Sequence, residues 1–141
     1  MILIDEADWP ISLVRWEYPA DQCDVDLYRS RFRLWLLRKS RFAVFNMVDL
    51  GTSTMRSIER MHGYGWARPL RDQIKSRCVG VAVLLTDALV TERRLHILHK
   101  ACADHMECPV RCFVHNDDAL RWLRQRLSAA GIEGHDGVAE I

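Results

Sequence analysis

The chain lacks any apolar run that approaches the roughly 20 residues needed to cross a membrane. Its first residues, MILIDEADWP, also lack the basic-then-apolar order of a signal peptide. No excess of one charge is present: 20 Lys and Arg face 19 Asp and Glu, a formal net charge of +1, which argues against a dedicated nucleic-acid binder. We therefore expect a cytoplasmic protein without membrane insertion and without a nucleic-acid partner.

Paired cysteine motifs are absent as well. The five cysteines form no CxxC motif, and an odd number does not fit a secreted disulfide framework, so we expect reduced thiols. The motifs GxSxG, HExxH and GxGxxG and the P-loop do not occur either. These absences predict a protein that is not an enzyme and that carries no cofactor.

Three short apolar runs, at 41–49, 79–87 and 109–115, are the clearest signals that are present. Each has the length of a strand, and the first two are too uniformly apolar to have a face in water, which is typical of a largely parallel sheet covered on both sides. The segment 11–17 instead shows a visible alternation of its side chains between the two faces of a strand. Together with residues 2–4 it predicts an edge hairpin across a turn at 7–10.

Segments with helical spacing separate these runs. We expect helices over 24–39, over 54–77 with an interruption at Gly63, Gly65 and Pro69, over about 91–106, and from a cap at Asn116 to Gly131. In the last of these, the side chains expected to face the core are Leu120, Leu123 and Leu127.

The order β-β-α-β-α-β-α-β-α predicts a single α/β domain over residues 1–130 and a flexible tail over 131–141. The domain is expected to be a sandwich with a mostly parallel sheet of four to five strands, an N-terminal edge hairpin and four helices.

This order resembles the SpoIIAA-like branch of the STAS superfamily, bacterial relatives of anti-sigma-factor antagonists. The resemblance covers about residues 9–128 and rests on the segments WPISLVRWE, RFAVFNMVDLG, RCVGVAVLLTD and CFVHNDDALRWLRQRL. It implies a non-catalytic regulatory module of bacterial signalling that exchanges protein partners, or alternatively senses a small ligand or nucleotide.

In the antagonists, a serine or threonine at the start of a helix is phosphorylated, and the matching corner here reads VDLGTSTMRS rather than their DSSGL-like segment. A helix start also holds anions, although serine and threonine commonly serve there as simple caps. Two acids end neighbouring predicted strands, where ligand sites of α/β sheets lie. The candidate phosphorylation, anion or ligand corner consists of Asp49, Gly51, Thr52, Ser53, Thr54 and Asp87.

The segment 62–69 combines aromatic residues, glycines and a proline at an interrupted helix. Because aromatic residues and arginine are favoured at binding hot spots, Tyr64, Trp66 and Arg68 form a candidate surface for a protein partner. The alternative is a kinked helix whose Trp66 fills the core. A homodimer is a further expectation for a domain of this kind.

Histidine and cysteine recur at every third position from His96 to Cys108, and both are metal ligands. The candidate metal site consists of His99, Cys102 and His105. Steps of three residues wind around a helix, however, so the alternative is a buried Cys102 between two histidines at the boundary of the core.

Overall fold

The computed structural model describes residues 1–17, 20–48, 65–86, 93, 96, 99–100 and 106–131. At its centre is a five-stranded sheet of order β1-β2-β3-β4-β5. The strands are β1 (Ile2–Asp5), β2 (Ile11–Trp16), β3 (Phe42–Val48), β4 (Cys78–Leu85) and β5 (Val110–Phe113). Strand β1 runs antiparallel to β2, and every later pair of neighbours is parallel.

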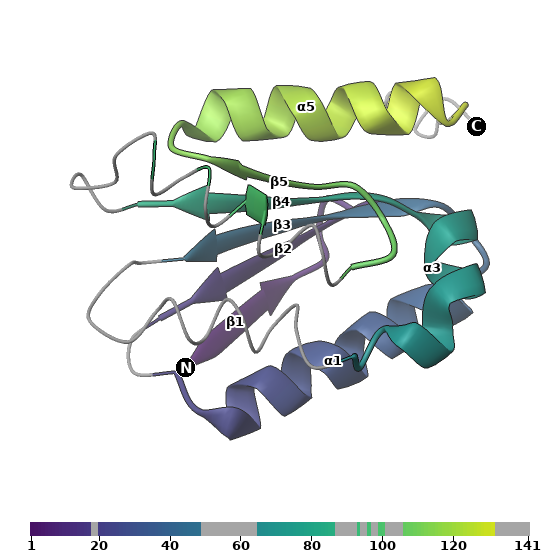
Figure 1. The fold of residues 1–141 in the computed structure, drawn as a ribbon, viewed down its shortest axis with the longest axis horizontal. Coiled ribbons are helices and arrows are strands. Elements are labelled where there is room, and N and C mark those ends of the chain that lie inside the picture. Colours follow the sequence, from purple (N-terminus) through teal and green to yellow (C-terminus); the bar gives the residue numbers. More distant parts are fainter. Residues whose placement is uncertain are drawn as a thin grey trace.

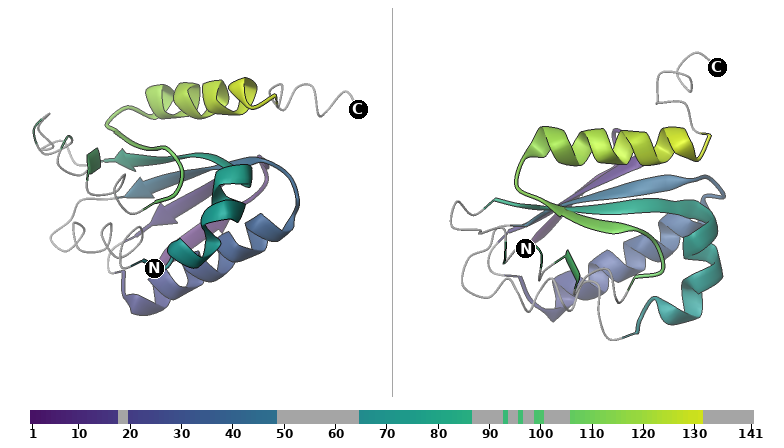
Figure 2. Two further views of the ribbon diagram at one scale, coloured as in Figure 1. Left: turned by 45° about the vertical axis from the view of Figure 1, so that its right-hand side comes forward. Right: turned by 45° about the horizontal axis from the view of Figure 1, so that its top comes forward.

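Helices cover both faces of the sheet (Figure 1). On one face lie α1 (Gln22–Leu37) and α3 (Arg71–Arg77), which follows the short 3-10 helix η1 (Arg68–Leu70). The opposite face carries α5 (Asn116–Ala129), and Figure 2 shows the same separation from two further directions. The molecule is therefore an α/β protein with a mixed sheet.

The predicted strands are confirmed, including the edge hairpin, and the three apolar runs lie side by side in the same direction. The described residues contain three complete α-helices, α1, α3 and α5, whereas the sequence predicted four; in the range of the predicted helix at 91–106, the described residues 93, 96, 99 and 100 are helical. Most of the predicted helix at 91–106 lies outside the described residues, as does the first part of the predicted 54–77 helix. Residues 132–141 of the predicted tail lie outside them as well.

Helix α1 begins at Gln22, two residues before the predicted start. The carboxylate of Asp21 accepts a hydrogen bond from the backbone N–H of Asp24 at 3.1 Å, and the Asp24 carboxylate accepts one from the backbone N–H of Asp21 at 3.0 Å. This reciprocal capping box satisfies two N–H groups that a helix start leaves without partners. Asp24 therefore belongs to the first turn rather than to the cap.

The core beneath α1 is rich in aromatic rings, which pack against one another largely edge to face. Asn46 of β3 lies fully buried among them. Its side-chain oxygen accepts a hydrogen bond from Trp16 Nε1 at 3.1 Å, and its Nδ2 donates to the Tyr28 hydroxyl at 3.4 Å. The rings of this layer belong to Trp16, Tyr28, Phe32, Trp35, Phe42 and Trp66.

Helix α5 packs through Leu123 and Leu127, which are fully buried, while Leu120 is only partly buried. Its N-cap residue is His115, not the predicted Asn116, which is the first helical residue. His115 forms no side-chain capping bond. The negative charges of Asp117 and Asp118 in the first turn instead interact favourably with the positive end of the helix dipole. The helix ends before Gly131, whose φ of 86° suits glycine.

Candidate functional site

Most residues of the predicted sites lie outside the described part of the chain. This holds for all six residues of the candidate corner (Asp49, Gly51, Thr52, Ser53, Thr54 and Asp87) and for Tyr64, Cys102 and His105. The structure places three of the predicted residues: Trp66, Arg68 and His99.

Trp66 lies in the core and is only 9% exposed. Its ring packs edge-on against Phe32, with 5.4 Å between the ring centroids, and the guanidinium of Arg29 lies over it at 5.6 Å. A side chain buried to this extent offers little surface to a partner, so the packing favours the alternative of a core-filling tryptophan. Arg68 is exposed at the start of η1.

His99 is partly buried, and its Nδ1 finds no hydrogen-bond partner among the described residues. Burial and the positive charge of Arg111 lower the pKa of its imidazole. Within the part of the chain that the structure describes, no group of three or more His, Cys, Asp or Glu side chains is placed to hold a metal ion.

The outer face of α1 carries leucines that the sequence analysis did not single out. Leu27, Leu34 and Leu37 are 45%, 54% and 69% exposed, and the spacing of seven and three residues places them on one side of the helix. Cys23, one turn before Leu27, is also exposed. We call Leu27, Leu34 and Leu37 the leucine stripe. This face is opposite the aromatic face that covers the sheet, so α1 is apolar on two sides.

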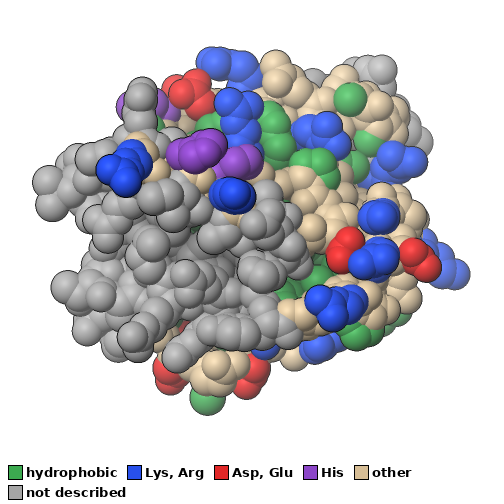
Figure 3. Space-filling model, in the orientation of Figure 1, with side chains coloured by type: hydrophobic (Ala, Val, Ile, Leu, Met, Phe, Trp, Pro, Cys, Tyr) green, Lys and Arg blue, Asp and Glu red, His purple; other side chains and the backbone are tan. Residues whose placement is uncertain are grey.

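Charges are distributed unequally along α1. The acidic side chains Asp24 and Asp26 lie in its N-terminal half, and the basic side chains Arg31 and Arg33 lie in its C-terminal half, although its last turn carries none. Figure 3 shows Asp and Glu groups at the lower edge of the molecule and a mixture of Lys, Arg, Asp and Glu toward the right. Two positions seven residues apart, Asp26 and Arg33, are exposed and flank the leucine stripe on the same side.

Charges on the other flank of the stripe are engaged within the chain. Arg31 Nη1 lies 2.7 Å from the Glu6 carboxylate, and Arg38 pairs with the same carboxylate. Asp24 Oδ2 lies 3.2 Å from the N-terminal amine. These contacts tie α1 to the N-terminal hairpin.

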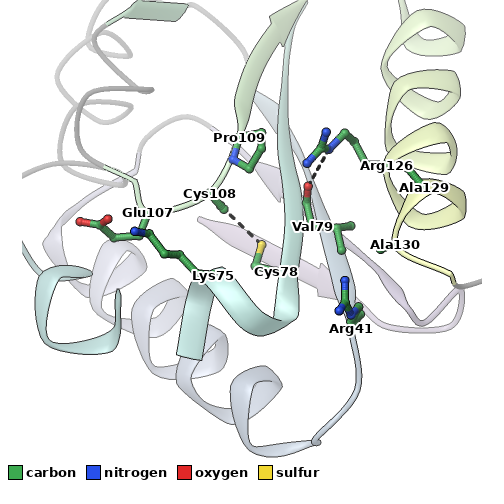
Figure 4. A pocket seen from close by; sticks show the side chains of 10 residues that line it. All are labelled: Arg41, Lys75, Cys78, Val79, Glu107, Cys108, Pro109, Arg126, Ala129 and Ala130. Atoms are coloured by element: carbon green, nitrogen blue, oxygen red, sulfur yellow. Dashed lines mark hydrogen bonds between the residues drawn. The ribbon is translucent and has the colours of Figure 1, made fainter. Parts of the chain in front are cut away.

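A pocket of about 400 Å³ opens where the parallel strands begin (Figure 4). Three cationic side chains line it: Arg41 before β3, Lys75 of α3 and Arg126 of α5. Arg126 Nε donates to the backbone oxygen of Val79 at 3.0 Å. The acidic residue of its lining, Glu107, lies 3.3 Å from Arg71 Nε. The pocket therefore carries an excess of positive charge.

Two thiols also line this pocket, with 3.6 Å between Cys78 Sγ and Cys108 Sγ. The hydrogen bond to Cys78 and burial together raise the pKa of Cys108 well above its ordinary value. The sequence analysis missed this pair because the residues are 30 positions apart. A signal was present, since each cysteine directly precedes a predicted strand, and parallel neighbours begin at the same edge of a sheet.

Within the described residues, no helix combines the length and the hydrophobicity that a membrane span needs. Comparison of the chain with family models, with curated proteins and with solved structures gives no match. The function proposed below therefore rests on the geometry of these surfaces and on the resemblance stated above.

Proposed function

We propose that this chain is a STAS-like, non-catalytic regulatory module of cytoplasmic bacterial signalling that works by binding proteins through the outer face of α1. The observation that carries the proposal is the exposed leucine stripe. The resemblance adds support, since the expected order of strands agrees with the observed sheet. Covering the sheet requires one apolar face of α1, and the second apolar face is suited to a further protein surface.

The partner whose chemistry this face fits best is a second copy of the chain, with the two α1 helices antiparallel. In that arrangement the acidic N-terminal half of each helix meets the basic C-terminal half of the other, and the helix dipoles are opposed. A twofold axis near Ser30 places Leu27 opposite Leu34 of the second copy. The small side chain of Ser30 stands at the crossing point, where two helices approach most closely.

The flanking charges agree with this arrangement. A twofold axis perpendicular to two antiparallel helices brings the same flank of each together, so Asp26 of one copy lies beside Arg33 of the other. On the other flank of the leucine stripe, Asp24 and Arg38 come to lie at the interface, and each already forms an ion pair within its own chain. The face is thus complementary to itself in both hydrophobicity and charge.

Sedimentation equilibrium over a wide range of concentrations tests the proposal. The unaltered chain is expected to dimerise, and Leu34→Glu is expected to be monomeric because it places a charge in the centre of the apolar contact. Leu3→Glu is the matched control, since Leu3 of β1 is also exposed, at 48% against 54% for Leu34. A chain that stays monomeric throughout, or a Leu3→Glu variant that dissociates as readily as Leu34→Glu, would contradict the proposal.

A charge exchange tests the antiparallel register. Asp26→Arg and Arg33→Asp are each expected to weaken the dimer, because each places like charges beside one another. The double variant restores opposite charges and is expected to recover most of the affinity. If the double variant is weaker than both single variants, the helices do not pair in this register.

A small-ligand or nucleotide sensor remains the alternative function, with the corner of Asp49, Thr52 and Asp87 as its site. Phosphorylation at Thr52, Ser53 or Thr54 also stays a prediction, as does metal binding by His99, Cys102 and His105. A rise in melting temperature on addition of nucleotides would favour the sensor. Phosphopeptide mapping after incubation with ATP and native lysate, and metal analysis of untagged protein, test the other two.

A further inference from the structure

We propose that Cys78 and Cys108 form a redox site, which closes to a disulfide by exchange with an anionic low-molecular-weight disulfide of the glutathione class. This site lies in the pocket at the starts of the parallel strands and does not depend on the dimer proposed above. The reduced form is the one in the structure, where both thiols are free.

The backbone already holds the two sulfur atoms close together. Their separation of 3.6 Å has to shorten by about 1.5 Å to reach the bond length of a disulfide. Cys78 is the first residue of β4, and Cys108 stands two residues before β5, its parallel neighbour. The backbone N–H of Val81 donates to the Pro109 oxygen at 2.9 Å, which fixes the segment of Cys108 against β4.

The surroundings of the thiols favour an anionic reactant. Cys78 and Cys108 are both among the residues that line the pocket, and Figure 4 shows their side chains pointing toward each other. Arg41 and Lys75 are exposed at its rim, and Arg126 completes the excess of positive charge over Glu107. Glutathione disulfide carries several carboxylates, so this charge raises its local concentration. The volume of about 400 Å³ accommodates part of such a molecule.

The exchange has two steps. Cys108, the less buried of the two residues, loses its proton and attacks one sulfur of the small disulfide. The S–S bond of the reactant breaks, and one small thiol leaves with that proton. Cys78 then attacks the Cys108 sulfur of the mixed disulfide, and its proton leaves with the second small thiol. The protein loses two electrons and two protons, and one small disulfide is reduced to two thiols.

The raised pKa of Cys108 leaves little thiolate at neutral pH, so the exchange is expected to be slow. The test is therefore made at equilibrium. The full chain is held in buffers with increasing ratios of glutathione disulfide to glutathione, quenched with acid, and its free thiols are alkylated. As the ratio rises, the number of free thiols is expected to fall by two from the total of five.

Peptide mapping identifies the bond. Cleavage after arginine and lysine together with cleavage after glutamate cuts the chain after Arg77, Glu107 and Arg111, which separates Cys108 from both Cys102 and Cys112. The expected product joins the peptide that begins at Cys78 to the peptide 108–111. If Cys78 and Cys108 stay reduced at every ratio, or if either joins another cysteine instead, the proposal is overturned.

Matched variants complete the test. Cys23→Ser changes an exposed cysteine of α1 and is expected to leave the linked peptide unchanged, while Cys108→Ser is expected to abolish it. Arg41→Gln is expected to slow the exchange with glutathione disulfide several-fold but not the exchange with the neutral hydroxyethyl disulfide. Equal rates of the variant and the unaltered chain with glutathione disulfide would overturn the assignment of an anionic reactant.

Discussion

Helices α1 and α5 cover opposite faces of the same sheet, yet their outer faces differ in kind. Helix α5 presents charged and polar side chains to water: Asp117, Asp118, Arg121, Arg124, Gln125 and Ser128 are all exposed. On α1 the leucine stripe is exposed between charged flanks. The pattern of α5 is explained by packing on the sheet alone, whereas the pattern of α1 is not. The dimer proposed above would account for this difference, because it covers the leucine stripe.

The inner faces of the two helices differ as well. Beneath α1 the core contains a cluster of six aromatic rings near the buried Asn46, together with aliphatic side chains. Beneath α5 it consists largely of aliphatic side chains, with Gly80 of β4 against the ring of Trp122. Edge-to-face rings and a buried amide have orientational requirements that aliphatic groups lack. Substitutions in the α1 layer are therefore expected to cost more stability than comparable ones beneath α5.

The largest effect is expected from Phe32→Ala on the inner face of α1. Phe32 is fully buried and contacts the rings of Tyr28, Trp35 and Trp66, so the truncation leaves a cavity and lowers the free energy of unfolding by about 4 kcal/mol. Leu34→Ala, on the outer face of the same helix, is expected to change it by no more than about 0.5 kcal/mol at a protein concentration at which the chain is monomeric. Urea denaturation of both variants checks the difference, and similar losses would show that the two faces of α1 are not distinct.

Asn46→Ala is expected to lower the free energy of unfolding by about 2 kcal/mol, because it leaves the buried N–H of Trp16 without its acceptor. The same denaturation measurement applies. In a background of Trp16→Phe, which removes that N–H group, the substitution is expected to cost clearly less. An equal cost in both backgrounds would show that the hydrogen bond is not the source of the loss.

On the opposite face, Gly80→Ala is expected to cost about 1 kcal/mol through overpacking. A Cβ atom at this position would lie 3.1 Å from the outer edge of the Trp122 ring, which has to move by a few tenths of an ångström. In a Trp122→Leu background the cost is expected to disappear. If Gly80→Ala destabilises both backgrounds equally, the backbone of β4 rather than the ring is responsible.

Much of this fold could be predicted from the sequence because two central strands, β3 and β4, are almost continuously apolar and bounded by polar residues. The start of α1 was misplaced, since a capping box consists of two acids whose roles depend on geometry. The cap of α5 was wrong for a similar reason: Asn116 has the right chemistry, but the backbone turns one residue earlier.

The surfaces were harder to predict than the fold. The outer face of α1 is hard to interpret from the sequence, because charged residues outnumber the three leucines among which they stand. The pair of Cys78 and Cys108 depends on which strands are neighbours, and that information is distributed over the whole chain. The placement of Trp66 in the core depends on packing against α1, which lies far from it in sequence.

The smallest effect concerns the contact that holds α1 to the N-terminal hairpin. Burial tends to raise the pKa of Glu6, but the hydrogen bond from Arg31 and the charge of Arg38 outweigh it, so the pKa of this carboxyl lies below its ordinary value of 4.5. The contribution of Glu6 to stability is therefore fully present above pH 4.5 and is lost as the pH falls through its lowered pKa. Glu6→Gln is expected to cost about 1 kcal/mol or less at neutral pH, because both arginines are partly exposed.

Urea denaturation near pH 7 and at about pH 3 checks this expectation, with the difference between Glu6→Gln and the unaltered chain shrinking at the lower pH. The comparison has to be made between the two proteins, because the pKa of Asp24 is lowered as well and its contribution is lost in both. Arg31→Gln in the two backgrounds separates the ion pair from other effects of the substitution. If the difference is the same at both pH values, Glu6 stabilises the fold through its shape or its hydrogen bonds. The ion pairs of Glu6 with Arg31 and Arg38 would then not be what holds α1 to the hairpin.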